Sequence, residues 1–242
     1  MAERFFVDQP IAGDRAVLAG PEAHHLIHVM RAKPGMRVVL FDGSGVEFAA
    51  EVCDVRRSEV TLAVLDRTQV DRELPLRLVL AVALPKGDRQ KWLIEKAVEL
   101  GVSQVVPLET ARSVAQPVEQ ALQRLRRTVI EASKQCGRNR LMELSLPRTW
   151  AQLIRGTADI PLRLLAHPGG QGDSSLIRDP QAGGHPSSFP SMVVAIGPEG
   201  GFSPDELRAA LEAGWQQVVL GTRILRVETA AIFLVASVIQ GL

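Results

Sequence analysis

The apolar and polar positions of the chain follow one pattern in its first third and another pattern afterwards. Short β-rich runs come first, the clearest at residues 37–41 and 46–55, with a strong turn signal between them. Residues 21–31 interrupt these runs with a helical pattern in which Leu26, Val29 and Met30 share one face. Several short strands with one small helix predict a compact β-barrel.

The second pattern alternates continuous apolar runs with helical segments. The apolar runs, which are typical of strands buried on both faces, are residues 76–84, 102–108, 162–166, 192–196 and 217–220. The helical segments are residues 88–100, 119–136, 204–213 and 227–239. Strand and helix in alternation predict an α/β domain with a parallel sheet.

A polar stretch at residues 66–75 separates the two patterns and is the predicted boundary between two domains. We therefore expect a barrel domain over residues 1–72 and an α/β domain over residues 73–242. A segment rich in Gly, Pro, Ser and Gln, residues 167–190, predicts a surface excursion within the second domain.

Composition and charge exclude several classes of protein. The formal net charge is +1, so bulk charge by itself does not indicate nucleic acid. Cys53 and Cys136 lie far apart, which argues against a disulfide scaffold or a zinc ribbon. His24, His25 and His28 lack a Glu or Cys ligand at suitable spacing, so we expect no metal site.

The chain also lacks the marks of a secreted or membrane protein. Its first residues do not show the basic-then-apolar pattern of a signal peptide. No apolar run approaches the roughly 20 residues that a membrane helix needs. We expect a soluble cytoplasmic protein with no membrane partner.

The first candidate site is a glycine-rich loop between a predicted strand and a predicted helix, Ile196-Gly-Pro-Glu-Gly-Gly-Phe-Ser-Pro-Asp-Glu206. Ser203 fits an N-cap and Glu206 its partner in a capping box. Glycines let the backbone approach a ligand closely, and ligands of such sheets bind at the carboxyl ends of strands. A tight strand–helix turn is an equally good interpretation, and neither a dinucleotide nor a triphosphate motif is present.

The second candidate site is the loop Leu220-Gly-Thr-Arg-Ile-Leu-Arg-Val-Glu-Thr-Ala230, which again follows a predicted strand. It places Arg226 and Glu228 at the same edge of the sheet. The helix after it, residues 230–239, is apolar on all sides. Such a helix must be buried, either in the centre of the fold or in a subunit interface.

A basic segment is the third candidate. Between Leu122 and Arg148 the chain has seven basic and two acidic residues, a local concentration that suits a phosphate backbone. A solvated helix face is the alternative. Aromatic residues are few and Tyr is absent, so extensive base stacking is not expected.

These motifs together resemble those of a known family. Gly197-Pro-Glu-Gly-Gly-Phe202, followed by Leu220-Gly-x-Arg-Ile-Leu-Arg-x-Glu-Thr-Ala230, resembles the signature of the RsmE family, 16S rRNA (uracil-1498-N3)-methyltransferases of the SPOUT class. The likeness extends to Lys86-Gly-Asp88, to Arg4-Phe-Phe6 and to His25-Leu26 with Arg31. It thus spans the whole chain in order.

The resemblance implies an N-terminal PUA-like β-barrel that binds RNA and a C-terminal α/β domain with a deep trefoil knot, which ordinary connection rules would not predict. It also implies a homodimer, S-adenosylmethionine as cofactor, and 16S rRNA of the small ribosomal subunit as partner. The cofactor residues expected from it are Ile196, Gly197, Gly201, Leu220, Gly221, Ile224, Leu225 and Arg226. The RNA-binding residues expected are Arg4, His25 and Arg31 near the N-terminus and Arg124, Arg127 and Arg138 in the basic segment.

Methylation at N3 of uracil requires loss of the N3 proton and tolerance of negative charge on the ring. Arg226 or Arg4 is the candidate for stabilising that charge. Glu228 is a candidate proton acceptor, although it is equally suited to orienting an arginine or capping the last helix. Two other functions stay open: a non-catalytic RNA-binding module, and a knotted methyltransferase that acts on tRNA or on a ribose 2′-hydroxyl.

Overall fold

The computed structural model describes residues 3–113, 119–168, 189–240 and 242. The predicted excursion at residues 167–190 therefore lies almost wholly outside the described residues. The chain divides into two compact units, one of residues 1–73 with 130–141 and one of residues 74–129 with 142–242. Each unit is described by itself below.

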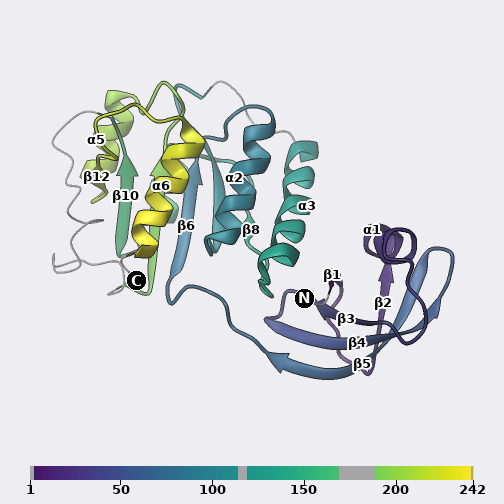
Figure 1. The fold of residues 1–242 in the computed structure, drawn as a ribbon. Helices are drawn as coiled ribbons and strands as arrows, with labels where there is room; N and C mark the ends of the chain where they lie inside the picture. Colours follow the sequence, from purple (N-terminus) through teal and green to yellow (C-terminus); the bar gives the residue numbers. More distant parts are fainter. Residues whose placement is uncertain (1–2, 114–118, 169–188, 241) are drawn as a thin grey trace. The chain divides into compact units, whose positions relative to one another are not determined.

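The first unit contains a five-stranded sheet in the order β1-β3-β4-β5-β2. The strands are β1 (Arg4–Phe6), β2 (Arg15–Ala19), β3 (Arg37–Phe41), β4 (Val46–Val55) and β5 (Glu59–Gln69). β1 pairs with β3 in parallel and the other pairs are antiparallel, with two irregularities of register between β4 and β5. The sheet curls around its own core, but β1 and β2 stand at opposite ends of the strand order (Figure 1). The predicted barrel is therefore a curled, half-closed sheet, because its edge strands do not pair.

The small helix of the first unit changes type partway. α1 (Gly20–His24) continues as a π-helix over His25–Val29. Leu26 is fully buried, as the helical pattern predicts, but Val29 is 63% exposed. A π-helix bonds five residues apart instead of four, so it rotates the following side chains away from the face that an α-helix would give them. The prediction for Val29 was therefore wrong.

The second unit contains a parallel sheet in the order β12-β10-β11-β6-β7-β8, with β9 also paired to β7. Its strands are β6 (Arg77–Val82), β7 (Gln104–Glu109), β8 (Glu143–Leu144), β9 (Arg148–Thr149), β10 (Leu162–Ala166), β11 (Ser191–Ile196) and β12 (Gln216–Val218). The central strands β6 and β11 are almost wholly buried, which explains their continuous apolar sequences.

Helices cover both faces of this sheet. α2 (Asp88–Glu99) and α6 (Val227–Gln240) pack side by side on one face, with α6 against β6 and β11 (Figure 1). α4 (Trp150–Gly156) and α5 (Pro204–Glu212) cover the other face through a core that includes Trp150, Phe202 and Trp215. After the edge strand β12, the chain returns to the sheet centre as α6.

α3 (Glu119–Cys136) is the long basic helix that the sequence predicts over the same residues. Its first part belongs to the second unit, and residues 130–136 belong to the first. The sequence pattern contains no sign of this assignment.

Candidate functional site

The glycine-rich loop after β11 is fixed by the start of α5. The Ser203 hydroxyl accepts a hydrogen bond from the Glu206 amide (3.2 Å), and the Ser203 amide donates to the Glu206 carboxylate (2.8 Å). The same carboxylate accepts a hydrogen bond from the Ala111 amide (2.7 Å). The predicted capping box is therefore confirmed, and it holds residues 197–203 against the segment that follows β7.

The glycines of this loop are required by close packing and by backbone conformation. A Cβ atom added to Gly197 would lie 3.2 Å from two atoms of the Phe202 ring. Gly201 has a φ of +68°, in the left-handed region that favours glycine. The loop can therefore come close to a ligand only with glycine at these positions.

The second loop connects β12 to α6. Gly221 has a φ of +115°, and Val227 begins the helix. The Arg226 carbonyl accepts the first helical hydrogen bond, from the Ala230 amide (2.8 Å). Residues 219–226 thus form an irregular loop between strand and helix, as the sequence predicts.

Both loops line one pocket, together with the end of β10. The pocket contains about 600 Å³ of space, which includes open solvent at its mouth. It lies at the carboxyl ends of the neighbouring strands β12, β10 and β11, where ligands of parallel sheets bind. Seven of the eight predicted cofactor residues line it: Ile196, Gly197, Gly201, Leu220, Gly221, Ile224 and Leu225.

The residues of this pocket suit S-adenosylmethionine. Ile196, Leu220 and Leu225 supply apolar walls for an adenine ring, and the glycines supply open backbone. One buried polar atom in the pocket, Nδ1 of His167, has no hydrogen-bond partner among the described residues. Such an atom is suited to contact with a polar ligand.

Arg226 and Glu228 lie in different surroundings, although only one residue separates them. Arg226 is exposed, does not line the pocket, and makes no ion pair with any described residue. Glu228 is 7% exposed and its carboxylate lies 3.5 Å from Nη1 of Arg89, on α2. A buried carboxylate held by an arginine is better suited to orienting its neighbours than to accepting a proton.

Several residues around the pocket, among them Arg89, Arg112 and His167, were not predicted from the sequence. Arg89 also lies 3.6 Å from the carboxylate of Glu199, which lines the pocket, so it links both loops. Arg112 donates to the Gly200 carbonyl (2.6 Å), and His167 is the first residue after β10. The available signal for His167 was its place at the carboxyl end of a predicted strand. Arg89 directly follows the Lys86-Gly-Asp88 motif.

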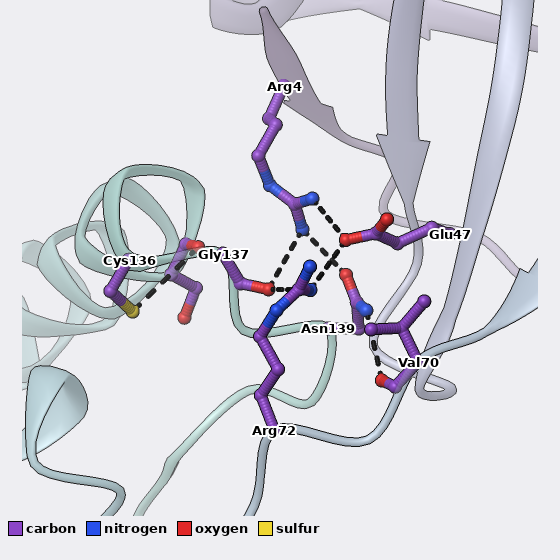
Figure 2. A network of polar contacts seen from close by, with 8 residues as sticks. Arg4, Glu47, Val70, Arg72, Cys136, Gly137 and Asn139 are labelled. Atoms are coloured by element: carbon purple, nitrogen blue, oxygen red, sulfur yellow. Dashed lines mark hydrogen bonds and ion pairs between the residues drawn. The ribbon is translucent and has the colours of Figure 1, made fainter. Parts of the chain in front are cut away.

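Arg4, the second candidate for anion stabilisation, belongs to the first unit and is part of a polar network there (Figure 2). Its guanidinium donates to Glu47 (2.5 Å) and to the Asn139 side chain (2.6 Å). Arg72 donates to the same Glu47 oxygen and to the Gly137 carbonyl, both at 2.7 Å. Arg4 is thus engaged in holding residues 137–139 against the sheet, which favours a structural role for it.

The other predicted RNA-binding residues divide into exposed and buried ones. Arg31, Arg124 and Arg127 are exposed, and His25 is half-buried with its ring 5.8 Å from that of Phe5. Arg138 is only 4% exposed, and its guanidinium donates twice to the Glu73 carboxylate. A side chain buried in this way has no free surface for a phosphate, so the prediction for Arg138 is replaced by a structural role.

Among the described residues, no group of three or more His, Cys, Asp or Glu side chains is arranged to hold a metal ion. No helix in the described part of the chain combines the length and apolar character needed to cross a membrane.

Two family models match successive parts of the chain. Residues 72–239 match the model of an RNA methyltransferase domain, and residues 18–65 match that of an RNA methyltransferase PUA domain. Ribosomal RNA small subunit methyltransferase E of Bacillus subtilis is 30% identical over 91% of this chain and 88% of its own. The protein of that name from Synechocystis is 33% identical over 95% of this chain and 75% of its own.

Solved structures give the same result. Ribosomal RNA small subunit methyltransferase E of Neisseria gonorrhoeae, crystallised with S-adenosylmethionine, is 28% identical with a TM-score of 0.85, over 98% of this chain and 96% of its own. A Legionella pneumophila structure in complex with the same cofactor is 31% identical with a TM-score of 0.87, over 98% and 97%. The mixed α/β fold with a PUA-type first unit is therefore confirmed.

Proposed function

The chain belongs to the family of ribosomal RNA small subunit methyltransferase E, and we propose that it methylates N3 of a uracil in the RNA of the small ribosomal subunit. Within the family resemblance that uracil is position 1498 of 16S rRNA. The methyl donor is S-adenosylmethionine, with which structures of this fold are crystallised.

One observation carries the proposal. Two glycine-containing loops that are far apart in the sequence, residues 196–201 and 219–225, line a single pocket at the carboxyl edge of the parallel sheet. Their apolar side chains suit adenine, and their open backbone suits a bent ligand. We assign the cofactor to this pocket.

The chemistry at N3 needs a cation close to the uracil ring. When bound, the cofactor supplies an electrophilic methyl group. Arg226 has an exposed guanidinium that forms no ion pair with any described residue, and it lies in the chain directly between the pocket residues Leu225 and Val227. We assign it the role of stabilising negative charge on the ring as the N3 proton leaves. Glu228, held by Arg89, orients the start of α6 and carries a favourable charge at the helix N-terminus.

Mass spectrometry of rRNA nucleosides tests the substrate. A strain that lacks this protein should lose 3-methyluridine from small-subunit rRNA, and the native gene should restore it. The Arg226→Ala gene, expressed at the same level, should not. Loss of a methylated ribose, or of a methylated base in tRNA, would contradict the proposed acceptor. Either result would still be consistent with a methyltransferase.

Calorimetry with S-adenosylmethionine addresses the alternative of a non-catalytic RNA-binding module. We expect one binding site per chain. A folded protein that does not bind the cofactor would support that alternative.

We also propose that the protein is a cytoplasmic homodimer that acts on the small ribosomal subunit. α6 buries Ala231, Leu234, Val235 and Val238 against its own unit, but Phe233 on the same helix is 43% exposed. An apolar helix with one uncovered aromatic face suits a subunit interface. Light scattering should give a dimer, and Phe233→Asp should give a folded monomer. A native monomer at micromolar concentration would contradict this proposal.

Within the basic segment, the residues that we propose to contact RNA are Arg124 and Arg127. Both are exposed on α3, and neither forms an ion pair with a described residue. Free guanidinium groups on one helix suit a phosphate backbone.

A further inference from the structure

His167 is a titratable side chain of the pocket to which the proposed chemistry gives no role. It follows directly on β10 and lines the pocket opposite the glycine-rich loop. A Cβ atom added to Gly201 would lie 3.6 Å from its Cε1 and 3.8 Å from its Nδ1. The ring therefore lies beside Gly201 of the glycine-rich loop and is part of the pocket wall.

The surroundings of the ring disfavour its charged form. Burial, and then the charge of Arg112, lower the pKa of His167 below its ordinary value of 6.5. Its buried Nδ1 has no partner among the described residues, so an imidazolium would have an N–H group without an acceptor. These surroundings therefore favour the neutral imidazole over the imidazolium.

Other charged groups near the ring come from three loops. Arg112, after β7, is held on the Gly200 carbonyl. Glu199, after β11, and Arg223, after β12, line the same pocket, and Glu199 is paired with Arg89. Among the side-chain types of this set, histidine is the one whose charge ordinarily changes between about pH 5 and about pH 8.

The ligand assigned to this pocket has a charge that makes this neutrality relevant. S-adenosylmethionine carries a sulfonium cation, whereas the product of methyl transfer, S-adenosylhomocysteine, has a neutral thioether and otherwise the same groups. Two positive charges within one partly dry pocket repel each other strongly. A neutral ring tolerates both ligands, but a charged ring disfavours the sulfonium compound.

We propose that His167 makes the pocket selective for ligand charge: the neutral ring admits the sulfonium cofactor, and the protonated ring disfavours it relative to the thioether product. This inference rests on the proposed function, because it takes the pocket to be the cofactor site. It predicts that cofactor and product affinities diverge as the pH falls through the titration of one residue.

Calorimetry of both compounds from about pH 8 to about pH 5, the range in which histidines titrate, measures the effect. The affinity for S-adenosylmethionine divided by that for S-adenosylhomocysteine should fall on the order of tenfold across this range in the native protein. The groups common to both compounds cancel in this ratio. His167→Gln, which is neutral throughout, should give a constant ratio.

His28→Gln is the matched control, because His28 is an exposed histidine of the first unit. It should keep the native pH dependence. A constant ratio in the native protein, or a native-like fall in His167→Gln, would overturn the inference. Failure of both compounds to bind at any pH would overturn the proposed cofactor site, and the inference with it.

Nuclear magnetic resonance of the native protein gives a second measurement that needs no stable variant at this position. Binding and titration are reciprocal, so S-adenosylmethionine should lower the pKa of His167 further, and S-adenosylhomocysteine should lower it less. Sequence-specific assignment of the native protein identifies the His167 resonance. Equal shifts with the two compounds would contradict a role for the sulfonium charge.

Discussion

The pocket of the second unit and the arginine network of the first unit use similar residues for different purposes. In the network, both terminal nitrogens of Arg4, and Nη1 of Arg72, donate to oxygens of the same unit (Figure 2). Around the pocket, Nδ1 of His167 has no partner, and the guanidinium of Arg226 forms no ion pair within the described part of the chain.

This difference separates structural polar groups from binding ones. A polar group whose partners lie within its own unit stabilises the fold, and its loss leaves those partners unsatisfied. A polar group without partners, placed at a pocket, is free to interact with a ligand. The number of arginines in a segment therefore says little about its function. Their burial and their hydrogen bonds indicate whether they stabilise the fold or are free to bind a ligand.

The largest effect that we expect comes from Arg226. Arg226→Ala should lower the single-turnover methylation rate by a factor on the order of 10² or more, because it removes a preorganised cation that acts mainly in the transition state. Affinity for S-adenosylmethionine, measured by calorimetry, should fall much less. Higher pH should partly restore the rate, since solvent base then supplies the uracil anion.

Arg208→Ala is the control for this variant, because Arg208 is an exposed arginine paired with Asp205 on α5. Its rate should equal that of the native enzyme. If Arg226→Ala instead loses cofactor binding and keeps its rate at saturation, then Arg226 is a binding residue.

The second effect tests the pocket itself. Gly197→Val should weaken cofactor binding by about 10²-fold, because even a Cβ atom would press against the Phe202 ring. Calorimetry on a variant with native circular dichroism measures this loss. Gly13→Ala, where an added Cβ meets no atom within 4 Å, should bind like the native protein. Native affinity in Gly197→Val would place the cofactor elsewhere.

The third effect tests the network. Glu47→Gln should lower the free energy of unfolding by about 1–3 kcal/mol, since Arg4 and Arg72 lose their shared carboxylate. Cofactor affinity should not change. Glu51→Gln, on the same strand but with an exposed pairing to Arg37, should cost less than about 0.5 kcal/mol. Equal stability of the two variants would contradict a structural role for the network.

This third effect should also depend on pH. Burial raises the pKa of Glu47, but the hydrogen bonds and charges of Arg72 and Arg4 outweigh it and lower the pKa below its ordinary value of 4.5. Because the pKa of Glu47 is lower in the folded protein than in the unfolded chain, its ionised form stabilises the fold. This stability is fully present above pH 4.5 and is lost as the pH falls through the pKa of Glu47 in the folded protein. The stability difference between native protein and Glu47→Gln should therefore shrink in acid, as denaturant titrations can show.

The smallest effect concerns RNA. The double variant Arg124→Ala/Arg127→Ala should bind RNA severalfold more weakly, and the slope of log affinity against log salt should fall by about 1.5, the value for two phosphate contacts. Filter binding at several salt concentrations measures both quantities. Arg138→Ala should leave the salt slope unchanged and lower stability instead, because Arg138 is buried against Glu73. An unchanged slope in the double variant would indicate that Arg124 and Arg127 belong to a solvated helix face and do not contact RNA.

The sequence by itself determined the local parts of the molecule. The predicted limits of α3 and β10 agree with the structure, and the capping box of Ser203 and Glu206 forms as expected. These features depend on residues close together in the chain, so periodicity and capping chemistry are enough to specify them. The two glycine loops also follow from local sequence, because each comes directly after a predicted strand.

Only the tertiary structure decided which distant residues meet. Arg89 lies on a helix more than a hundred residues before Glu199 and Glu228, yet it contacts both. His167 joins the pocket because β10 lies between β11 and β12 in the sheet, an order that no local pattern encodes. The sequence pattern does not distinguish Arg138 from the exposed arginines of α3, and only the tertiary structure shows its packing against Glu73. Sequence patterns specify which way a side chain faces on its own element, whereas burial, pairing and the state of a titratable group depend on what the rest of the chain places beside it.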